Sequence, residues 1–363
     1  MKKILTVVGA RPQFIKASVV SNAMRQSHKL FEVMVHTGQH FDANMSDVFF
    51  KELGMKPPDH FLDIHGGGHG AMTGRMLEQI ERVLLVEKPN AVLVYGDTNS
   101  TLAGALAAAK LHIPVAHVEA GLRSLNMAMP EEINRILTDR VSSLLFTPTA
   151  AASAHLRREG VSDAYISEVG DVMYDVALRH GKRVGATGGK LVQLGLTPGE
   201  YVLATVHRAE NTDQEYRLLA IVDGLQAAAK SIPVVWPLHP RTRGVLHRAG
   251  RLEGLSPNMQ LIEPLSYLDM VQLEKYAAVI ATDSGGVQKE AFFYRVPCVT
   301  LRNETEWMEL VDAGWNRLVP PLNAEAVRSA ILKALGQPGS DVQPYGAGDA
   351  AGLIVKRLVD ADL

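Results

Sequence analysis

Residues 282–290 read Thr-Asp-Ser-Gly-Gly-Val-Gln-Lys-Glu and directly follow an apolar run, Ala278 to Ala281. This order predicts a β-strand, a glycine turn and then a helix. The two glycines let the backbone approach a ligand, and the N–H groups at the helix start attract phosphate oxygens. The final glutamate is placed to accept hydrogen bonds from two ribose hydroxyls, so the stretch predicts a nucleoside-diphosphate site, with an ordinary strand-to-helix turn as the alternative. The predicted site residues are Ser284, Gly285, Gly286 and Glu290.

The length and composition indicate a two-domain protein that binds a small molecule. The chain has 363 residues, which is too long for one typical domain. Hydrophobic residues make up 47% and charged residues 21%, and the formal net charge is -2, which argues against disorder, a nucleic-acid surface and a polybasic membrane anchor. The single cysteine, Cys298, fits a reducing compartment, and no apolar stretch is long enough for a membrane span. We expect a cytoplasmic protein with no nucleic-acid or membrane partner.

Apolar strands alternate with helical stretches along the chain, and this alternation predicts parallel sheets covered by helices on both faces. The predicted strands are 4–8, 32–37, 91–95, 114–118, 144–147, 165–169, 201–205, 233–236, 259–262, 278–281 and 298–301. The predicted helices include 47–53, 72–87, 101–111, 150–159 and 350–358. The glycine-rich stretch 183–199 is interpreted as a loop and linker. We therefore expect an α/β fold with two Rossmann-like, doubly wound domains, 1–170 with a returning helix 349–363, and 171–348.

Three acids follow predicted strands of the first domain, where ligands gather in parallel sheets. Asp97 and Glu119 each come just after a buried strand, and Glu131 begins the next predicted helix. Asp97 could instead be a helix N-cap, and Glu131 could simply favour a first helical turn. Neither explanation suits Glu119. At the end of a buried strand, desolvation and neighbouring carboxylates would raise the pKa of Glu119 toward a useful range for proton transfer.

Basic and histidine side chains also occur where strands meet helices. Arg11 and Lys16 crowd the start of the first helix, where cations oppose the helix dipole. An incoming diphosphate explains this pair better than local stability does, and a solvated basic face is the alternative. His207 and His239 follow two predicted strands of the second domain, and their equivalent positions favour a functional role over a structural one.

With these motifs assembled, the chain resembles the non-hydrolysing UDP-N-acetylglucosamine 2-epimerase family along nearly its whole length. The matching motifs are Gly9 to Pro12 with Lys16, Thr37 to His40, Gly96 to Thr98, Glu119 to Arg123, Pro130 to Arg135, His207-Arg208, Thr282 to Glu290 and Thr305-Glu306. The resemblance implies two Rossmann-like domains in the arrangement called GT-B, a homodimer, and UDP held mainly by the second domain. It further implies catalytic or substrate-binding roles for Arg11, Lys16, Asp97, Glu119, Glu131 and His207, and UDP binding by Ser284, Gly285, Gly286 and Glu290.

The reaction that this resemblance implies explains the acids. The C2 hydrogen of the sugar is not next to a carbonyl, so its loss must accompany departure of UDP from C1, which gives a glycal. Re-addition of UDP with a proton delivered to the opposite face inverts C2, so acid/base groups are needed on both faces. Asp97, Glu119, Glu131 and His207 are the candidates, and Arg11 and Lys16 would stabilise the departing diphosphate. No cofactor or metal is required, and the histidines His65 and His69, which flank a glycine-rich loop, do not predict a metal site.

Several positions depart from the commoner family pattern. Trp307 follows Thr305-Glu306 where an arginine is usual, and Met270 stands where an aromatic residue is common near the uracil pocket. Phe41 to Asn44 depart in the region where bacterial members bind a second UDP-sugar as activator, so that regulation is not expected. Together the departures favour the subgroup that acts on UDP-2,3-diacetamido-2,3-dideoxyglucuronic acid in O-antigen lipopolysaccharide synthesis.

The expected substrate contacts follow from these departures. Trp307 is predicted to form an aromatic wall for the 3-acetamido group. The uronate carboxylate needs a donor, for which His65, His69 or the amides of Gly66 to Gly68 are candidates. Three other functions stay open at this point: a UDP-N-acetylglucosamine 2-epimerase making UDP-N-acetylmannosamine, a GT-B glycosyltransferase that needs an acceptor, and a non-catalytic UDP-sugar sensor that has no use for the acids.

Overall fold

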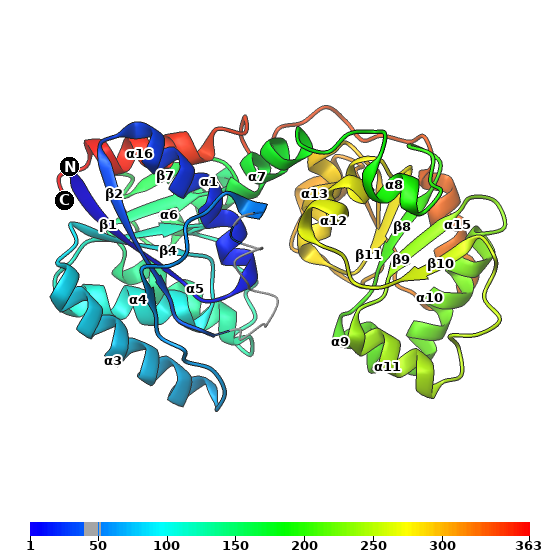
Figure 1. Ribbon diagram of the computed structural model, residues 1–363, viewed down its shortest axis with the longest axis horizontal. Coiled ribbons are helices and arrows are strands. Elements are labelled where there is room, and N and C mark those ends of the chain that lie inside the picture. The colour runs from blue at the N-terminus through cyan, green and yellow to red at the C-terminus, as the bar shows by residue number, and fades with distance from the viewer. Residues whose placement is uncertain (40–49, 51) are drawn as a thin grey trace. The chain divides into compact units, whose positions relative to one another are not determined.

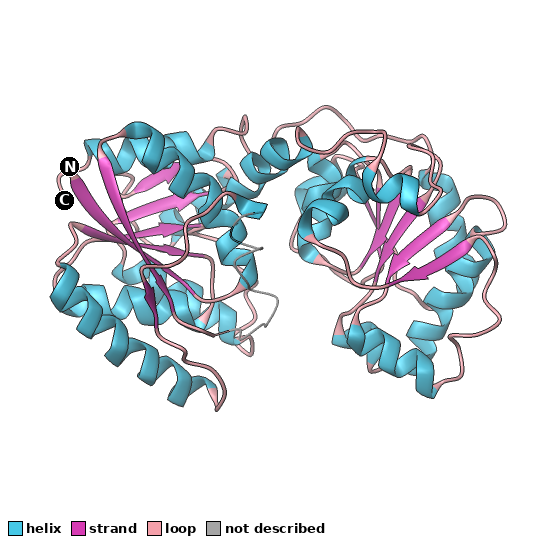
Figure 2. Ribbon diagram, viewed as in Figure 1, coloured by secondary structure: helices cyan, strands magenta, loops and turns pink. Residues whose placement is uncertain are grey.

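The computed structural model describes residues 1–39, 50 and 52–363 (Figure 1). Within them, Met1–Val176 with Gln343–Leu363 forms one compact unit, and Ala177–Val342 forms a second. Each unit is a parallel sheet flanked by helices (Figure 2), as the alternation of strands and helices predicts. Segment 40–44 lies outside the described residues, as does most of the helix expected at 47–53. Within the described ranges, no helix combines the length and apolar character needed to cross a membrane.

The first unit is built on a sheet with the strand order β3-β2-β1-β4-β5-β6-β7, and its strand pairs are parallel. The strands are β1 (Lys2–Val8), β2 (Leu30–His36), β3 (His60–Phe61), β4 (Ala91–Tyr95), β5 (Val115–Val118), β6 (Leu144–Thr147) and β7 (Ile166–Glu168). Every residue of β4 is buried. A strand covered on both faces needs a continuous apolar run, which is the pattern seen in the sequence.

Helices pack on both faces of this sheet (Figure 1). They are α1 (Arg11–Ser27), α3 (His69–Glu87), α4 (Asn99–Lys110), α5 (Pro130–Val141), α6 (Ala150–Arg158) and α16 (Ala350–Asp360). The last helix returns to pack beside α1 and is held at both ends by charge. The Asp175 carboxylate accepts from the N–H groups of Ala350 and Ala351, and the Lys2 ammonium donates to the Val359 carbonyl at 2.8 Å. An anion at the first turn and a cation at the last both complement the helix dipole.

The second unit has the strand order β10-β9-β8-β11-β12-β13, again with parallel pairs. Its strands are β8 (Val202–Thr205), β9 (Val234–Pro237), β10 (Met259–Ile262), β11 (Val279–Thr282), β12 (Cys298–Thr300) and β13 (Asn316–Leu318). Its helices are α9 (Ala209–Thr212), α10 (Glu215–Ala228), α11 (Pro240–Arg248), α12 (Tyr267–Lys275), α13 (Gly285–Phe293), α14 (Met308–Asp312) and α15 (Ala324–Ala334). Successive residues of β8 enter two different cores, Val202 and Ala204 on one face and Leu203 on the other.

The stretch between the two sheets contains more helix than its glycines predict. Helix α7 (Val172–Gly181) precedes the expected linker 183–199, and the short helix α8 (Gly189–Gln193) lies inside it. Reading 183–199 as loop throughout is therefore wrong at α8. The reason is tertiary packing: Leu191 is buried against the second unit's core, and Gln272 Oε1 accepts from the Lys190 N–H at 2.8 Å.

Candidate functional site

The strand order places the predicted residues at the point where ligands bind in doubly wound sheets. In the first sheet, β1 and β4 are neighbours whose chains continue toward opposite edges. In the second sheet the same is true of β8 and β11. Ligands occupy the crevice outside the carboxyl ends of such strands. The loops that begin there carry Arg11 and Asp97 in the first unit, and His207 and Ser284 in the second.

Lys16 and Glu119 form an ion pair in the first unit. The Lys16 ammonium, on α1, donates to Glu119 Oε2, and the Glu119 side chain is only 7% exposed. Glu119 has a φ of 70°, a strained backbone conformation of the kind that clusters at functional sites. Gly96 lets the carboxylate come close, because a Cβ at this position would lie 3.3 Å from Glu119 Oε2. The structure places a cation, Lys16, directly beside the Glu119 carboxylate.

A second ion pair holds Asp97. Arg135 on α5 donates to Asp97 Oδ2 at 2.6 Å and to Glu132 Oε2 at 2.7 Å. Burial alone would raise the pKa of Glu132, but N–H groups of the preceding loop and the Arg135 guanidinium hold it below its usual range. Asn134 donates to the backbone carbonyl of Asp97 at 2.9 Å. Helix α5 therefore fixes both the backbone and the carboxylate of Asp97. The sequence predicts the motif that carries Arg135, but it does not predict this contact with Asp97.

The other predicted residues of the first unit differ in their placement. Arg11 is half-buried at the start of α1, and Glu131 is exposed in the first turn of α5. His69 begins α3, and its Nδ1 lies 3.2 Å from Nδ2 of Asn99, two residues beyond Asp97. The His65 side chain is 49% exposed. The structure thus links His69 to the loop that carries Asp97. Among the described residues, no group of three or more His, Cys, Asp or Glu side chains is arranged to hold a metal ion.

In the second unit, the buried carboxylate of Asp283 organises the loop after β8. It accepts from the backbone N–H groups of His207 and Arg208 and from the side chain of Asn211, all at about 3 Å. The His207 ring lies 5.5 Å from the ring of His239. Burial lowers the pKa of His207, and His239 adds to the effect, so His207 is a neutral base at pH 7 despite Asp283 nearby. Asp283 is part of the glycine-turn motif in the sequence, but this role is set by contacts that the sequence does not reveal.

The start of α13 has the geometry of an anion site. Ser284 is the N-cap, and its Oγ accepts from the N–H of the third residue of the helix. A Cβ at Gly286 would have few close neighbours. A Cβ at Gly285 would lie 3.6 Å from Trp307 Nε1 and 3.5 Å from a guanidinium nitrogen of Arg208. The Trp307 indole donates to the Gly285 carbonyl at 3.0 Å, and the Lys289 ammonium lies 4.3 Å from the centroid of the indole ring. Trp307 is thus fixed at the loop predicted to hold phosphate.

Comparison with known proteins identifies the family. The family profile described as UDP-N-acetylglucosamine 2-epimerase matches residues 22–359. The chain belongs to this family. It is 55% identical over 362 residues to the UDP-2,3-diacetamido-2,3-dideoxy-D-glucuronate 2-epimerase of Pseudomonas aeruginosa, covering 98% of this chain and 99% of that one. The family predicted from the motifs is confirmed, and with it an enzyme of the UDP-sugar 2-epimerase class.

Solved structures of UDP-N-acetylglucosamine 2-epimerases share the fold. The Methanocaldococcus jannaschii enzyme in complex with UDP-GlcNAc and UDP superposes with a TM-score of 0.84 at 42% identity, covering 99% of both chains. The Neisseria meningitidis enzyme bound to UDP-GlcNAc gives a TM-score of 0.86 at 29% identity, covering 99% of this chain and 100% of that one. These matches confirm the predicted α/β class with two Rossmann-like domains of the GT-B type.

Two further residues predicted from the epimerase motifs lie on neighbouring helices. Glu290 is half-buried on α13, and Met270 is half-buried on α12, packed against the core of the second unit. Glu274, also on α12, is fully buried. Burial, with the charge of Glu290 adding to it, raises the pKa of Glu274 well above its usual range, so Glu274 is neutral.

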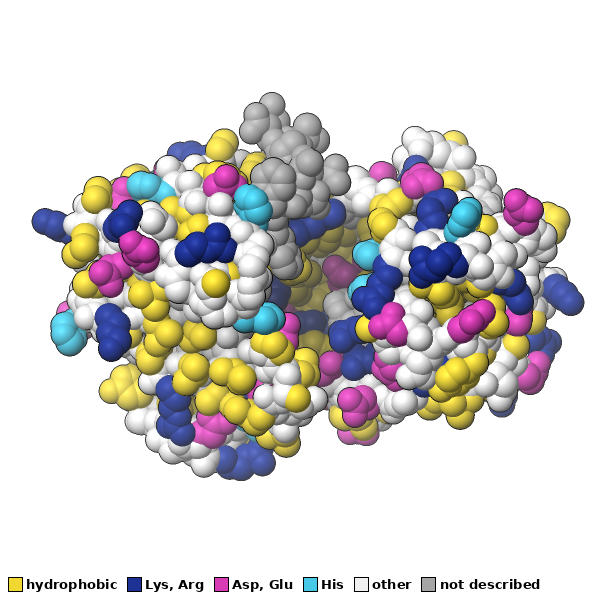
Figure 3. Space-filling model, turned by 90° about the horizontal axis from the view of Figure 1, so that it is seen from below, with side chains coloured by type: hydrophobic (Ala, Val, Ile, Leu, Met, Phe, Trp, Pro, Cys, Tyr) yellow, Lys and Arg dark blue, Asp and Glu magenta, His cyan; other side chains and the backbone are white. Residues whose placement is uncertain are grey.

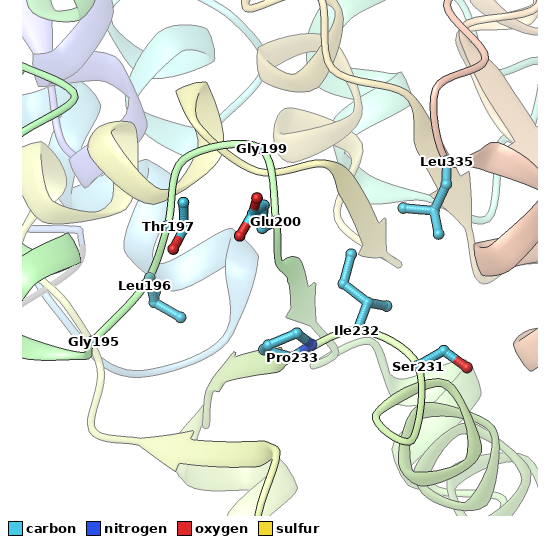
Figure 4. A pocket seen from close by; sticks show the side chains of 9 residues that line it. All are labelled: Gly195, Leu196, Thr197, Gly199, Glu200, Ser231, Ile232, Pro233 and Leu335. Carbon is cyan, nitrogen blue, oxygen red and sulfur yellow. The ribbon is translucent and has the colours of Figure 1, made fainter.

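A cavity of about 420 Å³ in this epimerase lies away from the predicted residues. It is lined by Gly195, Leu196, Thr197, Gly199, Glu200, Ser231, Ile232, Pro233 and Leu335 (Figure 4). Residues just before β8 and β9 contribute to it, so it lies at the amino ends of these strands. The predicted UDP loops lie at the opposite, carboxyl ends. This hollow is therefore not the site predicted from the motifs.

Proposed function

We propose that this epimerase inverts C2 of UDP-2,3-diacetamido-2,3-dideoxy-D-glucuronate and gives the manno epimer, for O-antigen lipopolysaccharide synthesis. The observation that carries the proposal is the position of Trp307 at Gly285. The usual family arginine there is replaced by an indole, which the Gly285 carbonyl and the Lys289 ammonium hold in place. The 55% identity to an enzyme named for this substrate supports the assignment.

The proposed chemistry is an elimination followed by an addition. A carboxylate of the first unit takes the C2 proton while the C1–oxygen bond breaks, UDP leaves and a glycal forms. A protonated group then delivers a proton to the other face of C2 as UDP re-adds at C1. Asp97, Glu119 and Glu131 are the proposed acids, and His207, neutral because burial lowers its pKa, is a further acceptor.

The proposed binding roles follow the contacts of each unit. Ser284, Gly285 and Gly286 offer a hydroxyl and helix N-terminal amides to the diphosphate, and Glu290 offers a charged carboxylate to the ribose. Arg11 and Lys16 would stabilise negative charge on departing UDP. Lys16 is already bound to Glu119, so we propose that it also stabilises that carboxylate in its charged, proton-accepting form.

The features proposed to select the sugar are Trp307 and His69. Because Lys289 covers the indole ring at 4.3 Å, the opposite ring face is the one we assign to the apolar 3-acetamido group. His69 is proposed as the donor for the uronate carboxylate, because it is the candidate that contacts the Asp97 loop through Asn99. A donor placed for a carboxylate discriminates against a neutral sugar, which leaves that donor unpaired.

The test is a pair of proton-NMR time courses with UDP-2,3-diacetamido-2,3-dideoxy-D-glucuronate and with UDP-N-acetylglucosamine, each supplied alone without an activator. We expect the diacetamido-uronate to be epimerised far faster. Equal or faster turnover of UDP-N-acetylglucosamine would refute the substrate assignment and favour production of UDP-N-acetylmannosamine. A glycosyltransferase would give no sugar isomer, and a sensor would give no chemistry.

We also propose a homodimer formed through the helical layer that includes α5. This helix buries its polar residues Glu132 and Asp139 and exposes Ile133 and Leu137, at 40% and 43%. Further exposed apolar side chains are Leu85 and Val86 on α3 and Leu125 and Met127 before α5. Figure 3 views the molecule from below, and hydrophobic side chains gather on the part of this surface that the first unit forms. Such a patch marks an interaction surface.

Sedimentation equilibrium tests the dimer. The double variant Ile133→Asp/Leu137→Asp should be monomeric at concentrations where the wild-type chain is dimeric. Val192→Asp, which alters an exposed apolar side chain of the second unit, is the matched control. A wild-type monomer, or a double variant that stays dimeric, would refute this surface.

We place the enzyme in the cytoplasm, where its one thiol, the buried Cys298, stays reduced.

A further inference from the structure

His117 lies at the third position of β5, and both nitrogens of its fully buried ring contact oxygen atoms. Nδ1 lies 2.7 Å from Asp139 Oδ1 on α5, and Nε2 lies 2.7 Å from the carbonyl oxygen of Gly96. A carbonyl oxygen can only accept a hydrogen bond. Nε2 must therefore carry a proton and donate it to Gly96.

The second nitrogen contacts a carboxylate that has several further partners. The other oxygen of Asp139 accepts from Arg123 at 2.8 Å and from the Gly121 N–H at 3.1 Å. Burial alone would raise the pKa of Asp139, but its hydrogen bonds to His117 and Arg123 and the charge of Arg123 hold it below its usual range. The His117 ring is therefore held at both nitrogens, by Asp139 and by Gly96.

Asp139 joins this histidine to buried charged groups. It binds both His117 and Arg123, and Arg123 makes a two-pronged contact with Glu159 at 2.7 and 2.8 Å. Buried charges persist when they are paired and fully hydrogen-bonded, and removing one partner of such a pair is costly because the other stays buried without it.

We propose that the His117–Asp139 pair is a positioning device that fixes the loop of Asp97 against the loop of Glu119. The proposal rests on the function proposed above for these two acids. His117 holds the carbonyl of Gly96, the residue before Asp97. Asp139 holds a backbone N–H two residues after Glu119.

The backbone of these loops explains why they need such a restraint. Gly96, Glu119 and Gly121 have φ values of 64°, 70° and 79°. A non-glycine residue in this conformation is strained and persists only where its surroundings determine it. With the pair removed, Glu119 would lose a nearby restraint and shift relative to Asp97. A misplacement of about 1 Å costs roughly a hundredfold in rate.

The first test reads the Nε2 proton directly and needs no substrate. The protein is labelled with ring-15N histidine, and the His117 signals are assigned by their loss in His117→Gln. We expect the Nε2 signal of a protonated nitrogen, because Nε2 donates to the Gly96 carbonyl. An Nε2 signal typical of an unprotonated nitrogen would overturn the proposal. Because no turnover is involved, this result is independent of the substrate assignment.

The second test separates positioning from folding. In His117→Gln, which loses the ring that joins Gly96 to Asp139, we expect kcat to fall roughly 10–100-fold with KM nearly unchanged. The pH profile of kcat should shift as well. Asp139→Asn should behave alike, and it serves as the second variant if His117→Gln folds poorly. Both are measured on whichever UDP-sugar the wild-type enzyme turns over.

The matched control is His60→Gln. His60 also pairs with a carboxylate, Glu87 at 2.9 Å, but it lies on the edge strand β3, and Glu87 is also bound by Lys3 of β1. This variant should keep the wild-type kcat and pH profile. If His117→Gln or Asp139→Asn is folded and keeps the kcat and pH profile of wild type, the pair is only structural and the proposal fails.

Discussion

The ammonium of Lys289 lies 4.3 Å from the centroid of the Trp307 ring, and the edge of that ring is bound to the carbonyl of Gly285. An arginine at position 307, as in the commoner family pattern, would meet a like charge here. The two positions are therefore coupled: a cation at 289 favours an aromatic ring at 307. This coupling makes the pair a testable determinant of sugar choice.

Trp307→Arg should lower the preference for the diacetamido-uronate over UDP-N-acetylglucosamine, measured as the ratio of kcat/KM values, by about tenfold or more. Combining it with Lys289→Gln should raise activity on UDP-N-acetylglucosamine above that of the single variant, because the like charge is gone. Met308→Arg, which adds the same charge at the next, exposed residue, is the control and should leave the ratio unchanged. A ratio that Trp307→Arg does not change would show that Trp307 has no part in selection.

Substitutions of acids in the first unit should lower turnover, whereas substitutions at the UDP loop of the second unit should weaken UDP binding. Glu119→Gln keeps the shape and a contact for Lys16 but removes the proton acceptor, so kcat should fall by about a hundredfold or more. UDP affinity, measured by calorimetry, should stay within about twofold, because no residue of the α13 loop is changed.

Glu290→Ala should do the reverse. Loss of the hydrogen bonds from ribose to a charged carboxylate is worth about 1.5–3 kcal/mol, so Kd for UDP should rise roughly 10–100-fold. Asp97→Asn is the control, with UDP binding retained. Abolished UDP binding in Asp97→Asn together with a harmless Glu290→Ala would overturn the proposed division of roles.

Turnover in deuterated water should place deuterium at C2. The proton removed from one face is replaced on the other by a different group, and that group has already exchanged its proton with the solvent. Mass spectrometry of the epimer formed early in the reaction measures this. Product that keeps only protium at C2 would rule out elimination and re-addition with the acids proposed here.

Strand positions could be predicted from the sequence because both sheets are covered on both faces. Continuous apolar runs gave β6 and β10 their observed bounds, Leu144–Thr147 and Met259–Ile262. The short edge strand β13, Asn316–Leu318, begins with two polar residues and forms only because β12 offers it a partner. Helix α8 likewise depends on contacts with α12. Such elements are set by tertiary pairing, and local sequence does not reveal them.

In the candidate site, too, some residues could be predicted from the sequence and others could not. Asp97, Glu119 and His207 could be located because each follows an apolar strand. The residues that bind them could not be predicted. Arg135 reaches Asp97 across 38 positions of sequence, and Asp283 reaches the His207 loop across 76. A single sequence carries no signal for contacts at such separations, although Asp283 itself, an acid directly after a buried strand, was a signal of the kind that drew attention to Glu119.

Two buried histidines should make the folded chain less stable in mild acid. Burial lowers the pKa of His36 and of His180 to about 4, whereas an unfolded histidine has a pKa of about 6.5. Between these values the unfolded chain binds more protons, so the stability is complete above about pH 6.5 and falls as the pH approaches 4. Each histidine contributes up to about 3 kcal/mol to this loss. Asp175, whose pKa burial raises to about 6, acts in the opposite direction over part of the range.

Variants isolate the histidine contribution from that of Asp175. His180 packs edge-on against Tyr267 with ring centroids 5.4 Å apart, so His180→Phe keeps a ring in the same space and removes the titrating group. The drop in urea midpoint between about pH 7 and about pH 4.5 should be smaller in this variant than in wild type, because one proton fewer is taken up on unfolding. The exposed His247 provides the control, since His247→Phe should leave the drop unchanged. An equal drop in wild type and His180→Phe would show that His180 is not held neutral in the fold.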